Sequence, residues 1–407
     1  MSDMLHGIRV LDFTSNAAGP CCTGMLADYG AEVIKIERPV TGNDERTYGI
    51  QVDGMSLLGA WLNRGKKSVT MDLKDPEAVA LLQRIVQDCD ILVESARPGV
   101  MDRLGLGYEA LRRINPRLVY CSISAFGQSG PYSKKPGYDL IAQAMSGIMD
   151  LCGEQDGPPV KSGTTLSDYV GAINAFGSII TALRYAEKTG QGQQIDVSLL
   201  MTMIYLNGAV EYLNVGQKLT RSGNHHNTLA PYGLFQGRGG QSIVLAVISP
   251  KLWRAFCQVI GQPELADDPK FCTLQQRRAN APELIHIIER WLGSFDDISE
   301  AADLLDKAGI PSAKVFDQED VMYDPHIRDQ NYLVRVPTPS SVTSMDAFVA
   351  RGCIAKFSET PGKVKQAPCV GEHNSEILGR YGLGPEEIQQ LQARWNGAET
   401  VVKGVGV

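Results

Sequence analysis

GIRVLDF at residues 7–13 and AEVIKIE at residues 31–37 are the two runs that decide the fold of this 407-residue chain. Both are as short and as rich in Val, Ile and Leu as a buried β-strand. Between them, a turn containing Gly and Pro leads into a helix that is expected to continue to Ala27. A strand, a helix and a second strand at this spacing predict a parallel βαβ unit. The opening of the chain therefore predicts an α/β protein.

The alternation of strands and helices continues beyond this unit. Short apolar runs are followed by stretches with helical periodicity, which is the pattern of a parallel, doubly wound sheet. Residues 138–185 are expected to be mostly helical, with a break at a loop of Gly, Pro and Asp over residues 153–163. Further strands are expected at 68–73, 90–94 and 118–124, and the helices between them at 76–88 and near 108–114.

The character of the sequence changes after Asp196. A helix-like stretch over residues 199–213 leads into a polar loop at 223–227. A strand is then expected at 242–247, with helices up to about Gly309. A chain of this length is expected to form two domains rather than one core. A linker rich in Pro, Ser and Thr at 337–344 and an amphipathic helix at 385–394 complete the expected elements.

The composition excludes several classes of protein. Hydrophobic residues make up 43% and charged residues 21%, as in an ordinary soluble enzyme. The net charge of −7 argues against a general nucleic-acid binder. The nine cysteines form no CxxC pair, which predicts a reducing, cytoplasmic setting without a disulfide framework or zinc site. Residues 1–7 do not have the plan of a signal peptide, and no apolar run approaches the ~20 residues that span a bilayer, so no membrane association is expected.

Generic nucleotide and hydrolase motifs are not matched. The first strand–helix turn, Asn16–Pro20, is not followed by GxGxxG, and residues 59–67 resemble a phosphate loop with the wrong spacing. Residues 127–130 lack the second spacer of a GxSxG elbow, and the six histidines show no HExxH pattern. These motifs alone would indicate only an α/β enzyme-like protein.

Several blocks of the sequence, in order, carry a more specific signal. The chain resembles the class III CoA-transferases, the CaiB/BaiF-type family of formyl-CoA:oxalate and carnitine CoA-transferases. The resemblance covers nearly the whole chain and is weakest over residues 224–344. The blocks are residues 7–39, NRGKKSVTMDLK (63–74), RPGVMDRLGLGYEAL (97–111), SAFGQSGPYSKKPGYDLIAQAMSG (124–147), TGQGQQIDVSLL (189–200), and Gly371–His373 with Glu376–Leu378.

The resemblance implies a fold and an assembly. A large Rossmann-like, doubly wound domain is built from both ends of the chain, with a smaller α/β domain inserted. Two protomers are expected to interlock as a homodimer. The implied division is a large domain over 1–200, a linker helix over 201–224, a small domain over 225–325, and a C-terminal part over 326–407 that returns to the large domain.

The resemblance implies that Asp168 is the catalytic residue. Its carboxylate would attack an acyl-CoA thioester to give a mixed anhydride and then an aspartyl-CoA thioester. Acyl-CoA and small carboxylic acids would be the substrates, with no metal and no redox cofactor. A position at a helix N-terminus is expected to keep the carboxylate ionised. From the residues alone, the pattern Thr165-x-x-Asp168 favours a capping box over a catalytic role.

Coenzyme A needs positive charge near its phosphates and small residues near its pantetheine. The resemblance assigns these roles to residues in loops that follow successive strands, where open α/β sheets bind ligands. Among them Asn16 is a candidate donor to a reacting carbonyl, and Lys135 is a weaker candidate because Pro136 occupies the family's nearby basic position. The candidates for binding coenzyme A are Asn16, Ala18, Gly19, Arg38, Lys74, Arg103 and Lys135.

The acid pocket departs from that of the oxalate enzymes. They carry Gln at the position of Ala17, and residues 221–233 (RSGNHHNTLAPYG) replace their glycine-rich tetrad. The smaller Ala17 leaves space for an acid bulkier than oxalate. The candidates for contact with the acid are Ala17, Tyr48, Tyr138, His225 and His226, although the two histidines better suit a solvated loop.

Two alternatives remain within the same fold. α-Methylacyl-CoA racemases use a His and an Asp as acid–base partners, and their GHD motif is replaced here by Gly137-Tyr138-Asp139. A non-catalytic subunit that binds coenzyme A is the second alternative, because some family members work as two-subunit complexes.

Overall fold

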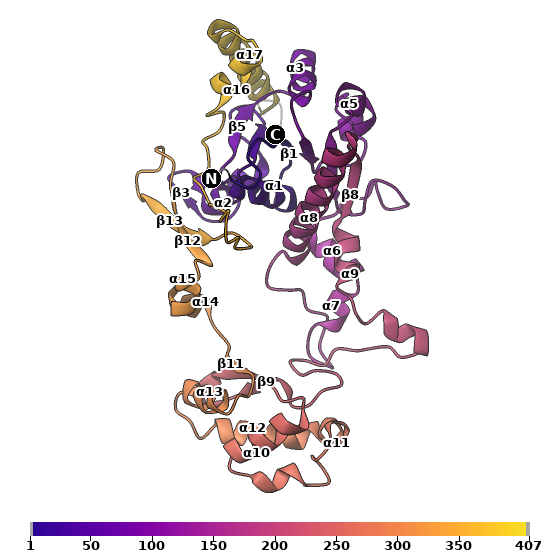
Figure 1. The fold of residues 1–407 in the computed structure, drawn as a ribbon, viewed down its shortest axis with the longest axis vertical. Coiled ribbons are helices and arrows are strands. Elements are labelled where there is room, and N and C mark those ends of the chain that lie inside the picture. The colour runs from indigo at the N-terminus through magenta and orange to yellow at the C-terminus, as the bar shows by residue number, and fades with distance from the viewer. Residues whose placement is uncertain (1–2, 404–407) are drawn as a thin grey trace. The chain divides into compact units, whose positions relative to one another are not determined.

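The computed structural model describes residues 3–403, with side chains as far as Gly397. The chain divides into two compact units, each with its own elements (Figure 1). The larger unit holds the chain up to Ile148, Ser162–Asn207, and the chain from Pro325 onward. The smaller unit holds Met149–Lys161 and Gly208–Asp324.

The centre of the larger unit is a six-stranded parallel sheet with the order β5-β2-β1-β6-β7-β8. The predicted α/β class with a parallel sheet is therefore confirmed. The chain builds one half of the sheet outward from β1 and then the other half from β6, so the strand order changes direction between these two strands. The strands are β1 (Arg9–Phe13), β2 (Glu32–Glu37), β5 (Lys67–Thr70), β6 (Ile91–Glu94), β7 (Val119–Ser124) and β8 (Gln194–Ser198).

Each face of this sheet has its own core. Successive residues of a strand point to opposite faces, and Val10 of β1 accordingly belongs to one hydrophobic cluster while Leu11 belongs to the other. The first cluster includes residues of α1 (Ala18–Asp28), α2 (Leu57–Leu62), α6 (Asp139–Met145), α8 (Leu166–Thr189) and α9 (Leu199–Tyr205). The second includes residues of α3 (Pro76–Val86), α4 (Val100–Arg103), α5 (Tyr108–Ile114), α16 (Asn374–Arg380) and α17 (Pro385–Lys403).

The C-terminal part of the chain returns to the larger unit. After the short helix α15 (Pro325–Asp329), β12 (Leu333–Pro337) and β13 (Ala347–Arg351) form an antiparallel hairpin, and the predicted linker at 337–344 lies largely in its loop. Helices α16 and α17 then pack beside β5 and α3 (Figure 1). The smaller elements of the larger unit are η1 (Asp44–Thr47), β3 (Gln51–Val52) and β4 (Met55–Ser56).

The smaller unit has a separate core around an antiparallel sheet with the order β11-β10-β9. It includes residues 149–161 because Arg221 pairs with Asp150 and Gly223 donates a hydrogen bond to the carbonyl of Gly153. Its elements are η2 (Glu211–Val215), β9 (Tyr232–Gln236), η3 (Arg238–Gly240), β10 (Ser242–Ala246), α10 (Pro250–Val259), η4 (Pro263–Ala266), α11 (Leu274–Ala279), α12 (Ala281–Leu292), α13 (Ile298–Lys307), β11 (Ser312–Lys314) and α14 (Gln318–Tyr323), while α7 (Ile148–Leu151) begins at its border.

The linker helix predicted over 201–224 does not form as one element. Helix α9 ends at Tyr205, and the next helical turn is η2. The side chain of Asn207 donates a hydrogen bond to the carbonyl of Ser146, and Gly208 follows it. This side-chain contact and the poor helix propensity of Gly explain why the apolar periodicity of this stretch does not become a long helix.

By length and composition, α8 could cross a membrane. The sequence of α8 contains no unbroken apolar run of this length, because polar residues interrupt it. Gly171, Ala175, Ile179, Ala182 and Ala186 are buried and lie three or four residues apart, on one face. This face packs against α1, β7 and β8. Helix α8 is thus a core helix of the larger unit.

A buried charge network fixes the turn after β1. The carboxylate of Asp12 lies 3.0 Å from the ammonium of Lys66 and 3.7 Å from that of Lys35, which also pairs with Glu45 at 3.1 Å. All four side chains are fully buried. Burial alone would raise the pKa of Asp12, but Lys35 and Lys66 outweigh it and hold the pKa at about 2. Asp12 accepts from the N–H of Thr14, and Lys35 donates to the carbonyl of Thr14.

We predict that Asp12→Asn destabilises the protein by about 3–5 kcal/mol, because it leaves two buried ammonium groups without their shared counter-charge. Urea unfolding at pH 7 measures the change. The matched control is Glu109→Gln, which removes an exposed pair with Arg112 and is expected to cost less than about 1 kcal/mol. Equal effects of the two substitutions would contradict a structural role for the network.

Candidate active site

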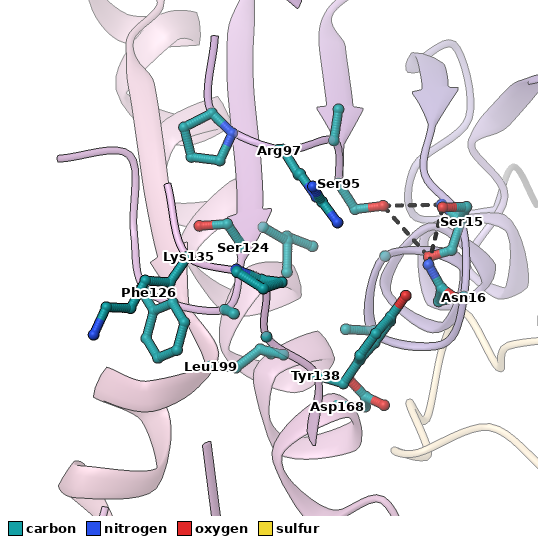
Figure 2. Close-up of a pocket in the computed structure, with 18 of the residues that line it drawn as sticks. Ser15, Asn16, Ser95, Arg97, Ser124, Phe126, Lys135, Tyr138, Asp168 and Leu199 are labelled. Carbon is teal, nitrogen blue, oxygen red and sulfur yellow. Dashed lines mark hydrogen bonds between the residues drawn. The ribbon is translucent and has the colours of Figure 1, made fainter. Parts of the chain in front are cut away.

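A cavity of about 200 Å³ opens where the strand order of the parallel sheet changes direction. Its walls come from the loops that follow β1, β6 and β7, and from the first turns of α1 and α8. Open α/β sheets bind ligands at this point because two neighbouring loops diverge there. Figure 2 shows these segments converging on one space. The polar residues in its lining are Ser15, Asn16, Ser95, Arg97, Ser124, Ser133, Lys135, Tyr138 and Asp168.

Asp168 is the acidic residue of this cavity. It lies in the first turn of α8, and among the described residues its carboxylate has no hydrogen-bond or ion-pair partner. Burial raises its pKa to about 7, and the nearby carboxylate of Asp139 adds to this effect. The expectation that the helix N-terminus holds Asp168 ionised is thus not met, because desolvation and a like charge dominate. A desolvated, unpaired carboxyl in a cavity has the properties of a functional group rather than a structural one.

The capping of α8 is performed by Asp139 and not by the predicted capping box. The side chain of Thr165 makes no capping hydrogen bond. Instead, one oxygen of the Asp139 carboxylate accepts the N–H of Ser167 at 2.7 Å, while the other accepts the amide of Gln143 at 2.8 Å. Gln143 in turn accepts the N–H of Ser162 at 3.0 Å. Asp168 is therefore not needed for capping and is free to face the cavity.

The turn between β1 and α1 forms the opposite wall. Asn16 has a φ of +67°, and its side chain accepts from the hydroxyl of Tyr48 at 2.6 Å and donates to the hydroxyl of Ser15 at 3.1 Å. The N–H of Ser15 donates to Ser95 at 2.9 Å, which joins the loops after β1 and β6. These bonds fix Asn16 at the cavity and Tyr48 behind it.

Gly19 allows the first turn of α1 to pack closely under this wall. A Cβ at this position would lie 2.3 Å from the Cβ of Thr14, a separation that side chains do not tolerate. Ala18 and Gly19 both line the cavity. Ala17 is the N-cap of α1 and is not among the described residues of the lining.

A second cavity, of about 620 Å³, adjoins the first. Ser15 and Ala96 line both, so the two spaces are neighbours. Arg38 and Lys74 lie in the lining of the second cavity, and Arg38 pairs there with Asp44. The rest of this lining is largely apolar and consists of Phe13, Ile36, Pro39, Met71, Leu73, Ala96, Val100, Met101, Leu104 and Trp395, with Ser15, Glu37, Asn43, Asp44 and Asp72 as its other polar members.

The structure brings most of the predicted residues of the larger unit together. Asn16, Ala18, Gly19, Lys135, Tyr138 and Asp168 line the first cavity, and Arg38 and Lys74 line the second. The ammonium of Lys135 lies 4.1 Å from the ring centroid of Tyr132, on the side of the cavity away from Asp168 (Figure 2). Arg103 is exposed and is not in the described lining of either cavity.

His225 and His226 lie in the smaller unit, where His225 forms a bridge to Gly233 and His226 packs against Tyr232. Their predicted contact with an acid stays a prediction. No group of three or more His, Cys, Asp or Glu side chains within residues 3–397 is arranged to hold a metal ion.

Several residues of the site were not identified from the sequence, and Arg97, Ser95 and Asp139 are the most informative of them. Arg97 points into the first cavity after β6 (Figure 2), and Ser95 precedes it. The available signal was the start of the RPGVMDRL block, whose Arg103 is a candidate instead. Asp139 caps α8, and it is part of the Gly137-Tyr138-Asp139 motif. Its role depends on a hydrogen bond from Ser167, 28 positions away, which spacing does not reveal.

The chain matches the model of CoA-transferase family III over residues 5–374. An acetyl-CoA:oxalate CoA-transferase of Acetobacter aceti is 42% identical over 81% of this chain and 85% of its own length. A succinate–glutarate CoA-transferase of Agrobacterium fabrum is 35% identical over 92% and 94%. A crystal structure of a CAIB/BAIF family protein from Brucella suis superposes with a TM-score of 0.82 at 33% identity, covering 93% of this chain and 100% of that one.

We predict that Asp168→Asn stabilises the protein at pH 8. A carboxyl whose pKa is higher in the folded state than in the unfolded state destabilises folding once it ionises. This penalty is absent below about pH 4, grows as the pH rises, and is complete above about pH 7. The variant is expected to gain a few kcal/mol at pH 8, since each pH unit between the two pKa values corresponds to about 1.4 kcal/mol.

Urea unfolding of both proteins at several values between pH 5 and pH 8 measures this difference. The gain should shrink as the pH falls. A gain in stability that does not depend on pH, or a loss of stability at pH 8, would show that ionisation of the Asp168 carboxyl does not destabilise the folded protein.

Proposed function

Because this chain belongs to CoA-transferase family III, we propose that it moves coenzyme A from an acyl-CoA donor to a free carboxylic acid through a covalent intermediate on Asp168. One observation carries the proposal. An unpaired, desolvated carboxyl lies in a cavity that adjoins a second, apolar cavity containing Arg38 and Lys74. The first cavity offers a nucleophile. The second cavity offers positive charge for the phosphates of coenzyme A and apolar surface for its nucleobase.

Coenzyme A is long and has two chemically different ends. Its phosphates would lie near Arg38 and Lys74, because ammonium and guanidinium groups bind phosphate through charge-assisted hydrogen bonds. The pantetheine would pass Ser15 and Ala96, which line both cavities, and bring the thioester to Asp168. Arg38 would exchange its pairing with Asp44 for a phosphate.

The reaction proceeds through four nucleophilic attacks, each of which releases one leaving group. The Asp168 carboxylate attacks the thioester carbonyl, which releases coenzyme A thiolate and leaves an acyl–aspartyl anhydride. The thiolate then attacks the aspartyl carbonyl of the anhydride, which releases the donor acid and leaves an aspartyl-CoA thioester. The acceptor carboxylate attacks this thioester, and the released thiolate attacks the acceptor carbonyl of the new anhydride. The products are acceptor-CoA and the regenerated Asp168 carboxylate.

The environment of Asp168 suits this chemistry. A carboxylate held by hydrogen bonds would be a weak nucleophile, whereas the bonds around α8 are made by Asp139 and leave Asp168 free. Burial and the like charge of Asp139 make the carboxylate more basic and therefore more reactive once ionised. Backbone N–H groups in the first turn of α8 would favour negative charge as each tetrahedral oxyanion forms.

We propose a short dicarboxylic acid as the acceptor. The relatives from Acetobacter aceti and Agrobacterium fabrum are named for oxalate and for succinate and glutarate. Arg97, which points into the cavity, offers positive charge for a second carboxylate.

We also propose a cytoplasmic homodimer. Tyr205 is 91% exposed at the end of α9, and Met201 and Ile204 of the same helix are exposed as well. Apolar side chains gathered in this way mark surfaces that other proteins cover. Sedimentation of the full chain would give twice the monomer mass, and a monomer at micromolar concentration would contradict this part of the proposal.

We predict that the protein forms new CoA esters from succinyl-CoA and a panel of oxalate, glutarate and other acids. Asp168→Asn should lower this turnover by at least about 10³-fold, because it removes the nucleophile. Mass spectrometry of the CoA esters measures both rates. The matched control is Thr165→Ala in the same turn, which should retain activity since its side chain makes no capping bond.

The same assay separates the alternatives. Deuterium exchange at the α-carbon of a 2-methylacyl-CoA, without transfer to any acid, would mean a racemase. The described lining of the cavity contains no histidine, which favours the transferase. Binding of coenzyme A without turnover of any acid would mean a non-catalytic subunit and would contradict the proposed activity.

A further inference from the structure

Gln143 is a buried amide that makes three hydrogen bonds close to the nucleophile. It lies in α6, and only 1% of the residue is exposed. Its side-chain nitrogen donates to Oδ2 of Asp139 at 2.8 Å and to the carbonyl of Thr164 at 3.4 Å. Its side-chain oxygen accepts the N–H of Ser162 at 3.0 Å. One amide thus joins α6 to the segment that leads into α8, and the four attacks at Asp168 give it no role.

The backbone partners of this amide determine which way it faces. A backbone N–H can only donate a hydrogen bond, and a backbone carbonyl can only accept one. The N–H of Ser162 therefore pairs with the amide oxygen, and the carbonyl of Thr164 pairs with the NH₂ group. The NH₂ group, rather than the oxygen, is consequently the part of Gln143 that faces Asp139.

Both oxygens of Asp139 then face groups that can only donate. Oδ2 accepts from the NH₂ group of Gln143, and Oδ1 accepts the N–H of Ser167 at 2.7 Å. A proton on either oxygen would take up acceptor capacity that these two donors use. Asp139 is buried, so water offers little replacement for a lost bond. Hydrogen bonds of this kind favour the ionised form of a carboxyl group.

The charge of Asp139 affects the nucleophile next to it. Burial is the main cause that raises the pKa of Asp168 to about 7, and the charge of Asp139 adds to it. The other charged side chains in the described lining of the first cavity are Arg97 and Lys135, and its phenol is that of Tyr138. A more basic carboxylate is a stronger nucleophile once it has lost its proton. Protonation of Asp139 would remove its part of this effect.

The elements packed against α8 hold two further carboxylates, and both have partners of their own. Among α1, α6, α9, β7 and β8, these are Asp28 of α1 and Asp196 of β8. Asp28 pairs with Arg64, and Asp196 accepts the N–H of Gln128. Asp139 is therefore the carboxylate whose state bears on Asp168.

We propose that Gln143 is a positioning residue for the nucleophile: its amide holds Asp139 ionised and fixes the entry to α8, so that Asp168 carries the proton of this carboxyl pair. The proposal rests on the proposed transferase function, because it concerns the nucleophile of that reaction. Gln143 is absent from the described lining of the first cavity, so it acts through Asp139 and residues 162–164.

The test replaces Gln143 with methionine, an unbranched side chain of similar length that forms no strong hydrogen bonds. Transfer from succinyl-CoA to the acid that the wild type uses best is followed between pH 5 and pH 9. The wild-type rate should rise through about pH 7, as Asp168 ionises. The midpoint of Gln143→Met should lie about one pH unit lower, because Asp139 then accepts a proton and no longer opposes this ionisation. Its limiting rate should fall about tenfold, since the first turn of α8 is held less firmly.

A matched control separates this role from the loss of any buried amide. Asn115 also makes three hydrogen bonds, but it precedes β7 and so lies at the edge of the sheet away from the cavity. Asn115→Leu should lower the free energy of unfolding and keep the wild-type pH midpoint. Asp139→Asn removes the charge itself and should shift the midpoint in the same direction as Gln143→Met. The double variant should shift no further than Asp139→Asn, because both substitutions act through one charge.

Infrared difference spectra locate the proton without any turnover, and they serve equally if Gln143→Met does not fold. At pH 5 the wild type should show the band of a protonated carboxyl that disappears in Asp168→Asn. The band should persist in Asp139→Asn, because burial alone keeps Asp168 protonated at this pH.

An unchanged pH midpoint in folded Gln143→Met, or an equal shift in Asn115→Leu, would overturn the inference and leave the proposed function intact. A protonated carboxyl whose band disappears in Asp139→Asn instead would overturn it as well. A wild type that transfers coenzyme A to no acid would refute the proposed function, and the infrared spectra would still decide which carboxyl holds the proton.

Discussion

The hydrogen bond from the N–H of Ser167 to the carboxylate of Asp139 is the contact on which the site depends. It caps α8 from a different helix, so the acidic residue in the first turn of α8 does not have to do so. The same carboxylate is also close enough to raise the pKa of Asp168. Asp139 thus caps α8 and also raises the pKa of Asp168. The buried pairing of Asp12 with Lys35 and Lys66 has a similar function for the turn that carries Asn16.

The sheet topology brings these local arrangements together. Because the strand order changes direction between β1 and β6, the loops after these strands separate and leave room for a ligand. The loop after β1 contributes Asn16, the loop after β6 contributes Arg97, and the loops after β2 and β5 contribute Arg38 and Lys74. The result is two adjoining cavities, one with an acidic nucleophile and one with cations beside apolar surface. This division corresponds to the two ends of an acyl-CoA.

The sequence predicted the parallel sheet well because buried strands are continuous apolar runs, as in GIRVLDF. It did not predict β8, whose Gln194 and Asp196 break the apolar pattern at the edge of the sheet. Asp168 was found only through the family resemblance, since its own pattern favours a helix cap. The role of Asp139 could not be found in this way, because it depends on a hydrogen bond from Ser167, which lies 28 positions further along the chain.

Intact-protein mass spectrometry after mixing the chain with succinyl-CoA, followed by peptide mapping, tests the central claim most directly. We expect an adduct with the mass of coenzyme A less water, located on the Asp168 side chain and removed by hydroxylamine. The adduct should be absent from Asp168→Asn. An adduct on any other residue, or transfer of coenzyme A at the wild-type rate without Asp168, would contradict this claim.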